Sequence, residues 1–337
     1  GVSSARVRVY LDGIPLNSRQ SGEADLSWID ASSLNSASIE YGTGAGGILR
    51  LSTVDDSYRG LTWSAGASNL SWLPPRGVAG LADTQRLSFS AKRGTESLRW
   101  NAGAFGTRAA NRFPYGDESG GTAYRESNGV LDAGFRAGLS FPLSRDASLA
   151  AAVSGYVADK NVPGSTGSAS SGRQEDSRAR ESVLLSLRDG DEARYDAEVA
   201  LAHSFSSVRW RDPAGVTRNA VNSLDLAARV SRYADDAHAV RFLTEASYVA
   251  CDSDSIGRKS LASATAGLAL DSRLPGRLST RAELRAVAPS GGDGWTAIPV
   301  VAVFKGVGDA SRLGISAFRA YKRPDLNALY WSGDPTA

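Results

Sequence analysis

The chain has 337 residues with 38 Lys and Arg against 36 Asp and Glu, so its formal net charge of +2 offers no basic excess for binding nucleic acid. A single cysteine, Cys251, excludes an intramolecular disulfide and a cysteine-based zinc site. No apolar run of about 18 residues occurs, which excludes a transmembrane helix, but a hydrophobic content of 42% is compatible with a transmembrane β-barrel.

The first predicted segment runs from Val7 to Thr53 and combines several short features. Its β-branched start ends at Asp12-Gly13, which predicts a strand that enters a tight turn, because Gly adopts positive φ without a Cβ clash. The features that follow are Ile14-Pro15-Leu16-Asn17, Asp25-Leu26-Ser27, Ile39-Glu40, Tyr41-Gly42, Gly46-Gly47 and a closing strand from Ile48 to Thr53.

The glycines between Gly42 and Gly47 also match the G-x-G-x-x-G spacing of a dinucleotide-binding loop. Such a loop requires a helix directly after it, with its N-terminus facing the pyrophosphate. The alternating, β-branched stretch from Ile48 to Thr53 predicts a strand instead. We therefore interpret these glycines as a loop that passes close to another backbone.

From about Gly60 the sequence becomes a series of segments that alternate apolar and polar residues, which predicts strands. Examples of the apolar sets are Leu87, Phe89 and Ala91; Leu131, Ala133, Phe135, Ala137, Leu139 and Phe141; Tyr195, Ala197, Val199 and Leu201; and Leu278, Ala282, Leu284 and Ala286. The segment around Arg281, Glu283 and Arg285 places charges opposite the last set, so we expect these charges in a wet interior and Leu278, Leu284 and Ala286 against lipid.

Alternation alone does not distinguish a soluble β-sandwich from a membrane barrel, so the connections decide. Short links are predicted at 93–97, 144–147, 188–192, 234–238, 274–276 and 306–311, and longer ones at 69–84, 108–129, 159–179, 206–222, 251–259, 289–294 and beyond Lys322. Regular exchange of short and long links favours an up-and-down barrel. About thirteen strands are predicted between Leu61 and Tyr321, an odd number that cannot close by itself into a bacterial barrel.

The segment from Val7 to Thr53 resembles the second half of the plug domain of TonB-dependent outer-membrane receptors. It departs from that family at Glu40-Tyr41, where a stretch containing Arg-Gly-Pro is missing. The stretch from Phe318 to Trp331 resembles a motif in the middle of the barrel of cobalamin-type receptors. The resemblance implies an all-β fold, with a plug segment over 1–57 inside a transmembrane, antiparallel β-barrel over 58–337, and a parent barrel of about 22 strands.

The chain starts at Gly1, contains no Met and shows no signal peptide, so we expect a mature or trimmed fragment of an exported outer-membrane protein. The resemblance implies that import is driven by a TonB-type energy-coupling protein. That protein would bind an N-terminal segment outside this sequence. Outer-membrane lipid is the other expected partner, and nucleic acid is not.

By the same resemblance, the loop after Leu16 reaches into the lumen and contacts the ligand. The ligand-binding candidates in that loop are Asn17, Ser18, Arg19, Gln20 and Ser21. Their amides and hydroxyls suit a large polar ligand, and Arg19 adds a site for an anion. The alternative is an ordinary exposed loop. Aromatic candidates for the outer rim are Phe113, Tyr115, Tyr124 and Trp331, with membership of the interfacial aromatic girdle as their alternative.

No combination of nucleophile, base and stabilising group supports an enzyme. His203 and His238 lie on different predicted strands without metal-type spacing and are interpreted as girdle or rim residues. Acidic pairs at 117–118 and at Asp252 and Asp254 leave Ca²⁺ binding in outer loops open. Because Glu126-Ser127-Asn128 stands where cobalamin-type receptors have acidic residues, we predict no metal site and no cofactor.

The predicted function is a receptor that binds and imports a scarce, large chelate across the outer membrane. Cobalamin is the first ligand hypothesis and a ferric siderophore is the second. The alternative is a barrel of the same shape that displays its loops as an adhesin or antigen and does not transport. The shortened stretch at Glu40-Tyr41 motivates this alternative, in which a plug without the usual Arg-Gly-Pro does not rearrange.

Overall fold

The computed structural model contains two β-sheets, one short hairpin and one short helix, and it describes most of the chain. The residues described below are 7–18, 20–31, 34–40, 47–53, 60–70, 84–110, 114–116, 121–124, 128–163, 171–188, 194–289, 294–307, 311–319 and 325–330.

The N-terminal sheet has four strands in the order β2-β1-β4-β3. Its strands are β1 (Arg8–Leu11), β2 (Ile14–Pro15), β3 (Ser36–Glu40) and β4 (Ile48–Ser52). The predicted turn joins β1 to β2, and both of its residues have positive φ, 50° at Asp12 and 82° at Gly13. This is the type I′ geometry that matches the twist of a two-residue hairpin. β4 then pairs with β1 in parallel, and Val9, Leu11 and Leu51 form a small apolar core.

The large sheet has thirteen strands that follow one another in chain order, and each pairs antiparallel with its neighbours. The strands are β5 (Gly60–Leu70), β6 (Thr84–Gly94), β7 (Arg99–Ala109), β10 (Val130–Pro142), β11 (Ala147–Pro163), β12 (Ser171–Arg188), β13 (Tyr195–Asp212), β14 (Gly215–Tyr233), β15 (His238–Ser253), β16 (Gly257–Leu274), β17 (Leu278–Pro289), β18 (Thr296–Val307) and β19 (Ser311–Phe318). The hairpin of β8 (Pro114–Gly116) and β9 (Thr122–Tyr124) lies between β7 and β10. The predicted up-and-down order of thirteen strands is confirmed.

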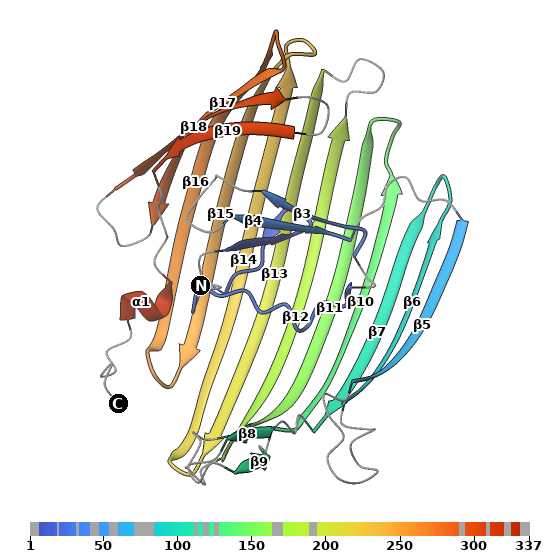
Figure 1. The fold of residues 1–337 in the computed structure, drawn as a ribbon, viewed down its shortest axis with the longest axis vertical. Coiled ribbons are helices and arrows are strands. Elements are labelled where there is room, and N and C mark those ends of the chain that lie inside the picture. Colours follow the sequence, from blue (N-terminus) through green and yellow to red (C-terminus); the bar gives the residue numbers. More distant parts are fainter. Residues whose placement is uncertain are drawn as a thin grey trace.

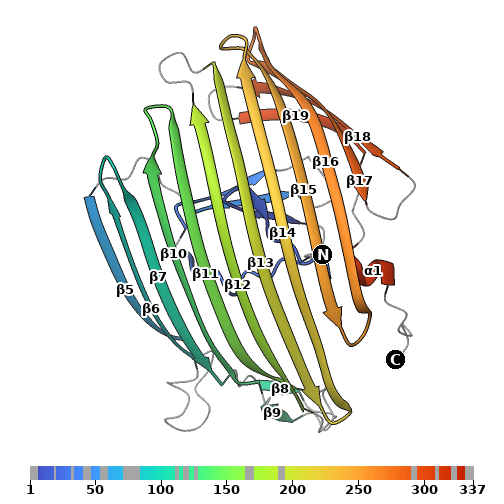
Figure 2. The same ribbon diagram turned by 180° about the vertical axis from the view of Figure 1, so that it is seen from behind.

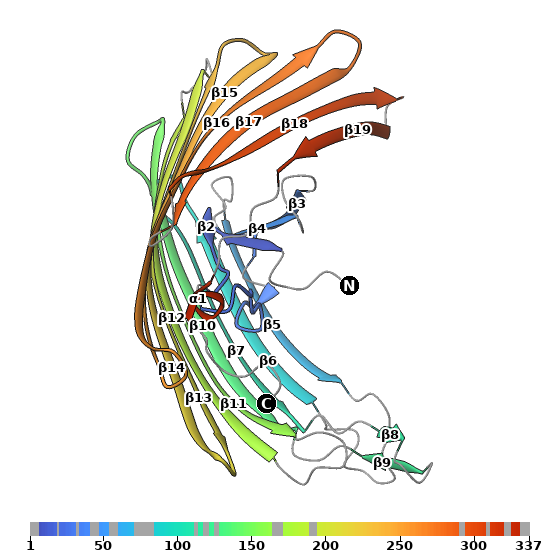
Figure 3. The ribbon, with the colours of Figure 1, turned by 90° about the vertical axis from the view of Figure 1, so that its left-hand side faces the viewer.

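The large sheet curves into an open trough, with β5 at one edge and β19 at the other (Figures 1 and 2). Seen from the side, the N-terminal sheet and the short helix α1 (Leu326–Tyr330) lie on its concave face (Figure 3). Among the described residues, no helix has the length and apolar character needed to cross a membrane. The fold class predicted from the sequence is therefore confirmed as an all-β, antiparallel, barrel-like sheet that the described residues leave open.

The two faces of the large sheet differ in polarity as the alternation predicts. On β17, Leu284 is 56% exposed on the convex face, whereas Glu283 is only 4% exposed on the concave face. Leu87, Leu131 and Leu201 are likewise exposed on the convex face, and Asp176, Arg180 and Asp225 are buried on the concave face. An exposed apolar outer wall around a polar interior is the arrangement expected of a barrel in lipid.

For three connections the prediction of a long loop is wrong, because the flanking strands extend into the predicted loop. β11 and β12 continue to Pro163 and from Ser171, so most of 159–179 is strand. β13 and β14 are separated only by Pro213 and Ala214, and β15 and β16 only by residues 254–256. Here both faces of the strands carry polar residues, so the period-two signal in hydrophobicity disappears. The backbone ladder does not depend on that signal and continues.

The turns at 95–98, 143–146, 234–237 and 275–277 lie at one end of the large sheet, which we call the short-turn rim. We call the parts of strands β11 to β16 that fall within 159–179, 206–222 and 251–259 the strand extensions. The strand extensions and the β8–β9 hairpin lie at the other end of the large sheet, which we call the opposite rim (Figure 1). The Glu40-Tyr41 junction and the loop after it, residues 41–46, lie outside the described residues.

Candidate functional site

The candidate site is the contact region between the N-terminal sheet and the concave face of the large sheet (Figure 3). β2 lies against β13 and β14, and Ile14, which is only 1% exposed, packs on Ala200 and Ala202 of β13. Small alanine side chains at these inward positions let the short strand approach the wall closely. Polar contacts surround this apolar contact on both sides.

The most buried polar contact joins Asp12, Thr53 and Arg136. Asp12 accepts hydrogen bonds from the amide and the hydroxyl of Thr53, both at 2.8 Å. The guanidinium of Arg136 on β10 donates to Asp12 Oδ2 at 2.7 Å and to Thr53 Oγ1 at 2.5 Å. The Arg136 and Asp12 side chains are only 10% and 6% exposed. A buried ion pair therefore holds the turn between β1 and β2 to the wall.

A second contact is made by Tyr10 of β1. Its hydroxyl donates to Glu245 Oε1 on β15 at 3.0 Å, and the guanidinium of Arg50 lies 5.0 Å from its ring centroid. Burial, together with the nearby Glu245 carboxylate, raises the pKa of Tyr10. The phenol is therefore neutral and remains a hydrogen-bond donor at physiological pH.

A third contact lies in the segment that follows loop 17–23. Asp25 Oδ2 accepts from Arg178 of β12 at 2.7 Å, and its Oδ1 accepts from the amide of Ser27 at 2.9 Å. Burial alone would raise the pKa of Asp25, but the Ser27 hydrogen bonds and the Arg178 charge outweigh it and lower that pKa. Trp28 packs beside Phe105 and Tyr156 of the wall.

The predicted loop residues have different roles in the structure. Asn17 uses its whole amide inside the N-terminal sheet, because Oδ1 accepts from Val9 N at 2.8 Å and Nδ2 donates to Val7 O at 2.8 Å and Gly22 O at 3.1 Å. Ser18 Oγ accepts from the amides of Gln20 and Ser21 at 3.2 and 3.3 Å. Asn17 therefore closes the loop and does not present its amide to a ligand.

Gln20 connects the loop to the large sheet and to α1. Its Nε2 donates to Asn219 Oδ1 of β14 at 3.2 Å, and its carbonyl accepts from Asn327 N of α1 at 2.9 Å. Ser253 of β15 donates to the same Asn219 oxygen. Helix α1 is fixed here by Leu326, which is fully buried in a cluster with Val221, Val249, Cys251, Ile256 and Leu261.

The remaining predicted residues are placed only in part. Arg19, Phe113 and Trp331 lie outside the described residues. Tyr115 and Tyr124 belong to the β8–β9 hairpin, where Tyr115 pairs with Ala123 and Tyr124 with Pro114. This hairpin is at the opposite rim, away from the N-terminal sheet (Figure 3). The structure thus brings Ser18, Gln20 and Ser21 together and does not bring the hairpin to them.

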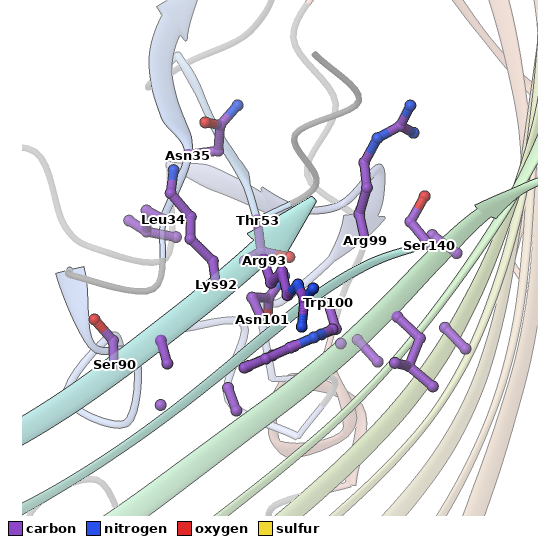
Figure 4. A pocket seen from close by; sticks show the side chains of 18 of the residues that line it. Leu34, Asn35, Thr53, Ser90, Lys92, Arg93, Arg99, Trp100, Asn101 and Ser140 are labelled. Carbon is purple, nitrogen blue, oxygen red and sulfur yellow. The ribbon is translucent and has the colours of Figure 1, made fainter. Parts of the chain in front are cut away.

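A cavity of about 190 Å³ lies on the short-turn side of this contact region, between the N-terminal sheet and the wall. Asn35 and Thr53 line it from the N-terminal sheet, and Lys92, Asn101 and Ser140 from the wall (Figure 4). Apolar side chains, among them Leu34, Trp100 and Leu184, make up the rest of the lining, so the cavity is of mixed polarity. In the described part of the chain, no group of three or more His, Cys, Asp or Glu side chains is arranged to hold a metal ion.

Sequence reasoning missed the wall side of the site, above all Arg136, Arg178, Asn219 and Glu245. Each is a polar residue at an inward position of an alternating strand, so its face could be predicted. Its partner could not, because the pairs are separated by as many as 235 positions in the chain.

Several solved structures share this fold. The siderophore receptor PirA from Acinetobacter baumannii matches 96% of this chain and 55% of its own, with a TM-score of 0.75 and 13% identity. A mutant of the ferric enterobactin receptor PfeA from Pseudomonas aeruginosa, solved with enterobactin, matches 95% and 55% with a TM-score of 0.72 and 16% identity. The outer membrane transporter YddB from Escherichia coli matches 96% and 54% with a TM-score of 0.69 and 12% identity.

The chain therefore spans about half the length of the solved proteins that it matches. No family model matches its sequence, and a search of curated proteins finds no match. At these identities the likeness concerns the fold. The resemblance to TonB-dependent receptors that the sequence indicated is confirmed at that level.

Proposed function

We propose that this chain is part of an outer-membrane receptor that binds a ferric siderophore and imports it with energy from a TonB-type protein. The observation that carries the proposal is a small sheet held by buried polar contacts against the concave face of a large sheet whose convex face is apolar. A membrane barrel with an occupied lumen has this combination, whereas a soluble sandwich buries its apolar faces.

In this proposal residues 1–57 are the plug segment and 58–337 are the barrel wall. The two-sheet organisation supports the division, because the N-terminal sheet ends at Ser52 and the large sheet begins at Gly60. The short-turn rim is then periplasmic and the opposite rim is extracellular.

A ferric siderophore now replaces cobalamin as the first ligand hypothesis. Two of the three proteins reported above are named siderophore or ferric enterobactin receptors, which supports this order. The stretch from Phe318 to Trp331 is the part of the sequence that resembles cobalamin-type receptors. That stretch includes α1, whose described contacts are with loop 17–23 and the wall, and they do not favour either ligand.

We propose Ser18, Gln20 and Ser21 as ligand contacts, with Arg19, Phe113, Tyr115 and Trp331 as further candidates. A ligand that accepts a hydrogen bond from the side-chain amide of Gln20 competes with Asn219, whereas the contact with α1 is made by the backbone carbonyl of Gln20. Ligand binding would thereby loosen the loop from the wall. Asn17 is proposed only to keep the loop in shape.

The test is binding of two probes, ferric enterobactin and cyanocobalamin, to the full-length protein in detergent, measured by quenching of tryptophan fluorescence. We expect saturable binding of the ferric chelate at micromolar or lower concentration and none of cyanocobalamin. Gln20→Ala should alter the affinity, and Arg229→Ala, an exposed position on β14 without a role in this site, should not.

Growth distinguishes import from display. A strain that lacks the protein should grow less well when the ferric chelate is its only iron source, and expression of the protein should restore growth. Normal growth of the deletion strain would contradict import and favour the adhesin or antigen alternative.

A further inference from the structure

Four arginines gather on the convex face of the strand extensions at the opposite rim: Arg173 on β12, Arg209 and Arg211 on β13, and Arg218 on β14. We call them the arginine cluster. Arg209 and Arg211 share the face of Leu201, and Arg218 shares the face of Leu224, because side chains alternate along a strand without a break in register. Trp210 points the other way, into the concave side, where it covers Gly172.

The arginine cluster lies just beyond the apolar part of the outer wall. On β13 the outward side chains from Ala197 to Phe205 are apolar apart from His203, which is hydrogen-bonded to Glu181 at 2.9 Å. Arg209 follows four positions after Phe205, roughly 13 Å further along the strand at ~3.3 Å per residue. In a barrel whose apolar band contacts hydrocarbon, this level is that of the lipid headgroups.

The register sets arginines directly opposite each other. Arg209 pairs across the ladder with Arg218, and Arg211 pairs with Arg173. Like charges in directly opposed positions destabilise a sheet. The arrangement is therefore unfavourable by itself and becomes favourable when an anion with several oxygens bridges the opposed guanidinium groups.

The carboxylates on this face neutralise only part of the cluster. Asp159 accepts two hydrogen bonds from Arg173, at 2.8 and 2.5 Å, and Glu175 lies 3.7 Å from Arg173 and 3.5 Å from Arg209. Asp254 accepts from the backbone amide of Arg218, and Asp252 pairs with Arg258. Within the described part of the chain, the side chains of Arg211 and Arg218 make no ion pair.

We infer that the arginine cluster binds phosphate groups on the headgroups of phosphorylated lipids in the outer leaflet of the membrane. The inference rests on the proposed membrane location. Charge supplies the attraction, and the neighbouring apolar wall supplies the anchor for acyl chains that a soluble phosphate lacks. The site would fix the height of the barrel in the membrane and select anionic lipids around it.

The test places the full-length protein in nanodiscs of phosphatidylcholine with a minor share of phosphatidic acid, whose phosphomonoester is the probe. Native mass spectrometry after removal of bulk lipid counts the lipids that stay bound. We expect phosphatidic acid to be enriched on the wild-type protein, and the double variant Arg209→Gln/Arg218→Gln to lose about tenfold of that enrichment. The variant Arg209→Lys/Arg218→Lys should retain part of it, because charge remains without the planar donor fork.

The matched control is Arg232→Gln. Arg232 lies on the same strand and the same face as Arg218, but at the short-turn rim and opposite Tyr195 rather than another arginine. This control should leave the enrichment unchanged, and all variants should keep the far-UV circular dichroism of the wild type.

Three results would overturn the inference. Equal enrichment on the wild type and the Arg209→Gln/Arg218→Gln variant would remove the site. Displacement of phosphatidic acid by millimolar inorganic phosphate would assign the cluster to a soluble anion. Failure of the protein to insert into lipid would remove both this inference and the proposed function, whereas insertion with unchanged enrichment removes the inference alone.

Discussion

Arg136 carries the most buried ionic contact between the two sheets, and its value depends on both partners staying in place. The Asp12 carboxylate sits in a turn with positive φ, so it has little freedom to follow a displaced partner. Burying two charges is costly, and the pair is favourable only while the remaining lone pairs are bonded, as the Thr53 contacts ensure here. Removal of one partner should therefore cost more than removal of both.

We predict that Arg136→Met lowers the free energy of unfolding by about 3 kcal/mol, because it leaves the Asp12 carboxylate buried without a cation. The double variant Asp12→Asn/Arg136→Met should recover part of the loss, since Asn tolerates positive φ and still accepts from Thr53. Chemical denaturation followed by tryptophan fluorescence measures both. The exposed Arg229→Met is the control, and equal stability of Arg136→Met and Arg229→Met would contradict the prediction.

Asp25 gives the N-terminal sheet a dependence on pH. Its pKa is lowered in the folded protein despite burial, by Ser27 and Arg178. A carboxyl with a lowered folded-state pKa stabilises the fold above its unfolded pKa of about 3.9, and this contribution disappears as the pH falls through the folded value. Because the side chain is 39% exposed, the contribution should be below about 1 kcal/mol.

The corresponding prediction is that wild type loses protection of the Ser27 amide against hydrogen exchange when the pH falls from neutral to below 4, after correction for the intrinsic rate. Asp25→Asn should show low protection at both pH values. A wild-type protein with the same corrected protection throughout would show that the Asp25 contacts do not stabilise this segment.

At the scale of elements, loop 17–23 has hydrogen bonds of two kinds, those that close the loop on the N-terminal sheet and those that join it to the wall. Asn17 holds the loop to β1 and Gly22, and Gln20 holds it to β14 and α1. These roles are separate because the two side chains have no partner in common. Variants of the two residues should therefore differ in what they change.

We predict that Asn17→Ala costs about 2 kcal/mol of stability, because it leaves Val9 N and two carbonyl groups without their partner, and that it weakens ligand binding through loss of loop shape. Gln20→Ala should leave stability nearly unchanged and increase the exposure of loop 17–23 to protease, because the side-chain contact with Asn219 is lost while the backbone carbonyl that accepts from α1 remains. Thermal unfolding and limited proteolysis of the two proteins give the comparison. Equal losses of stability would show that the loop acts as one unit.

The strand extensions show that a strand can continue beyond the point where its alternation of apolar and polar residues ends. At the tip of β13 and β14, Asp212 accepts from the amides of Ala214 and Gly215 at 2.8 and 3.0 Å, and Trp210 donates its indole hydrogen to the same carboxylate. The Trp210 hydrogen bond is the main reason for the lowered pKa of Asp212. Turn chemistry and backbone pairing thus stabilise a hairpin that has no apolar face.

At the scale of the whole molecule, the N-terminal sheet fills part of the trough, and the proposed import of a large ligand requires that this sheet move. Ile14 lies against Ala202 of β13, which offers a direct test. In a Cys251→Ala background, Ile14→Cys/Ala202→Cys should form a disulfide that abolishes import and leaves ligand binding intact. Addition of a reductant should restore import.

The controls for this experiment are the two single cysteine variants, which should transport in both redox states. Import by the oxidised double variant, once non-reducing mass analysis confirms the bond, would contradict the requirement for movement between Ile14 and the wall.

The sequence by itself determined the strand-rich class, the chain order of thirteen strands, the tight turn at Asp12-Gly13 and the faces of the alternating strands, because these depend on local periodicity and on φ preferences. It did not reveal the strand extensions, where both faces are polar. Only the tertiary structure decided which wall residues meet the N-terminal sheet, that Asn17 is internal and Gln20 external, and that arginines face each other across β12, β13 and β14. Those pairings follow from the register and curvature of a sheet that joins positions far apart in the chain, and no local pattern specifies them.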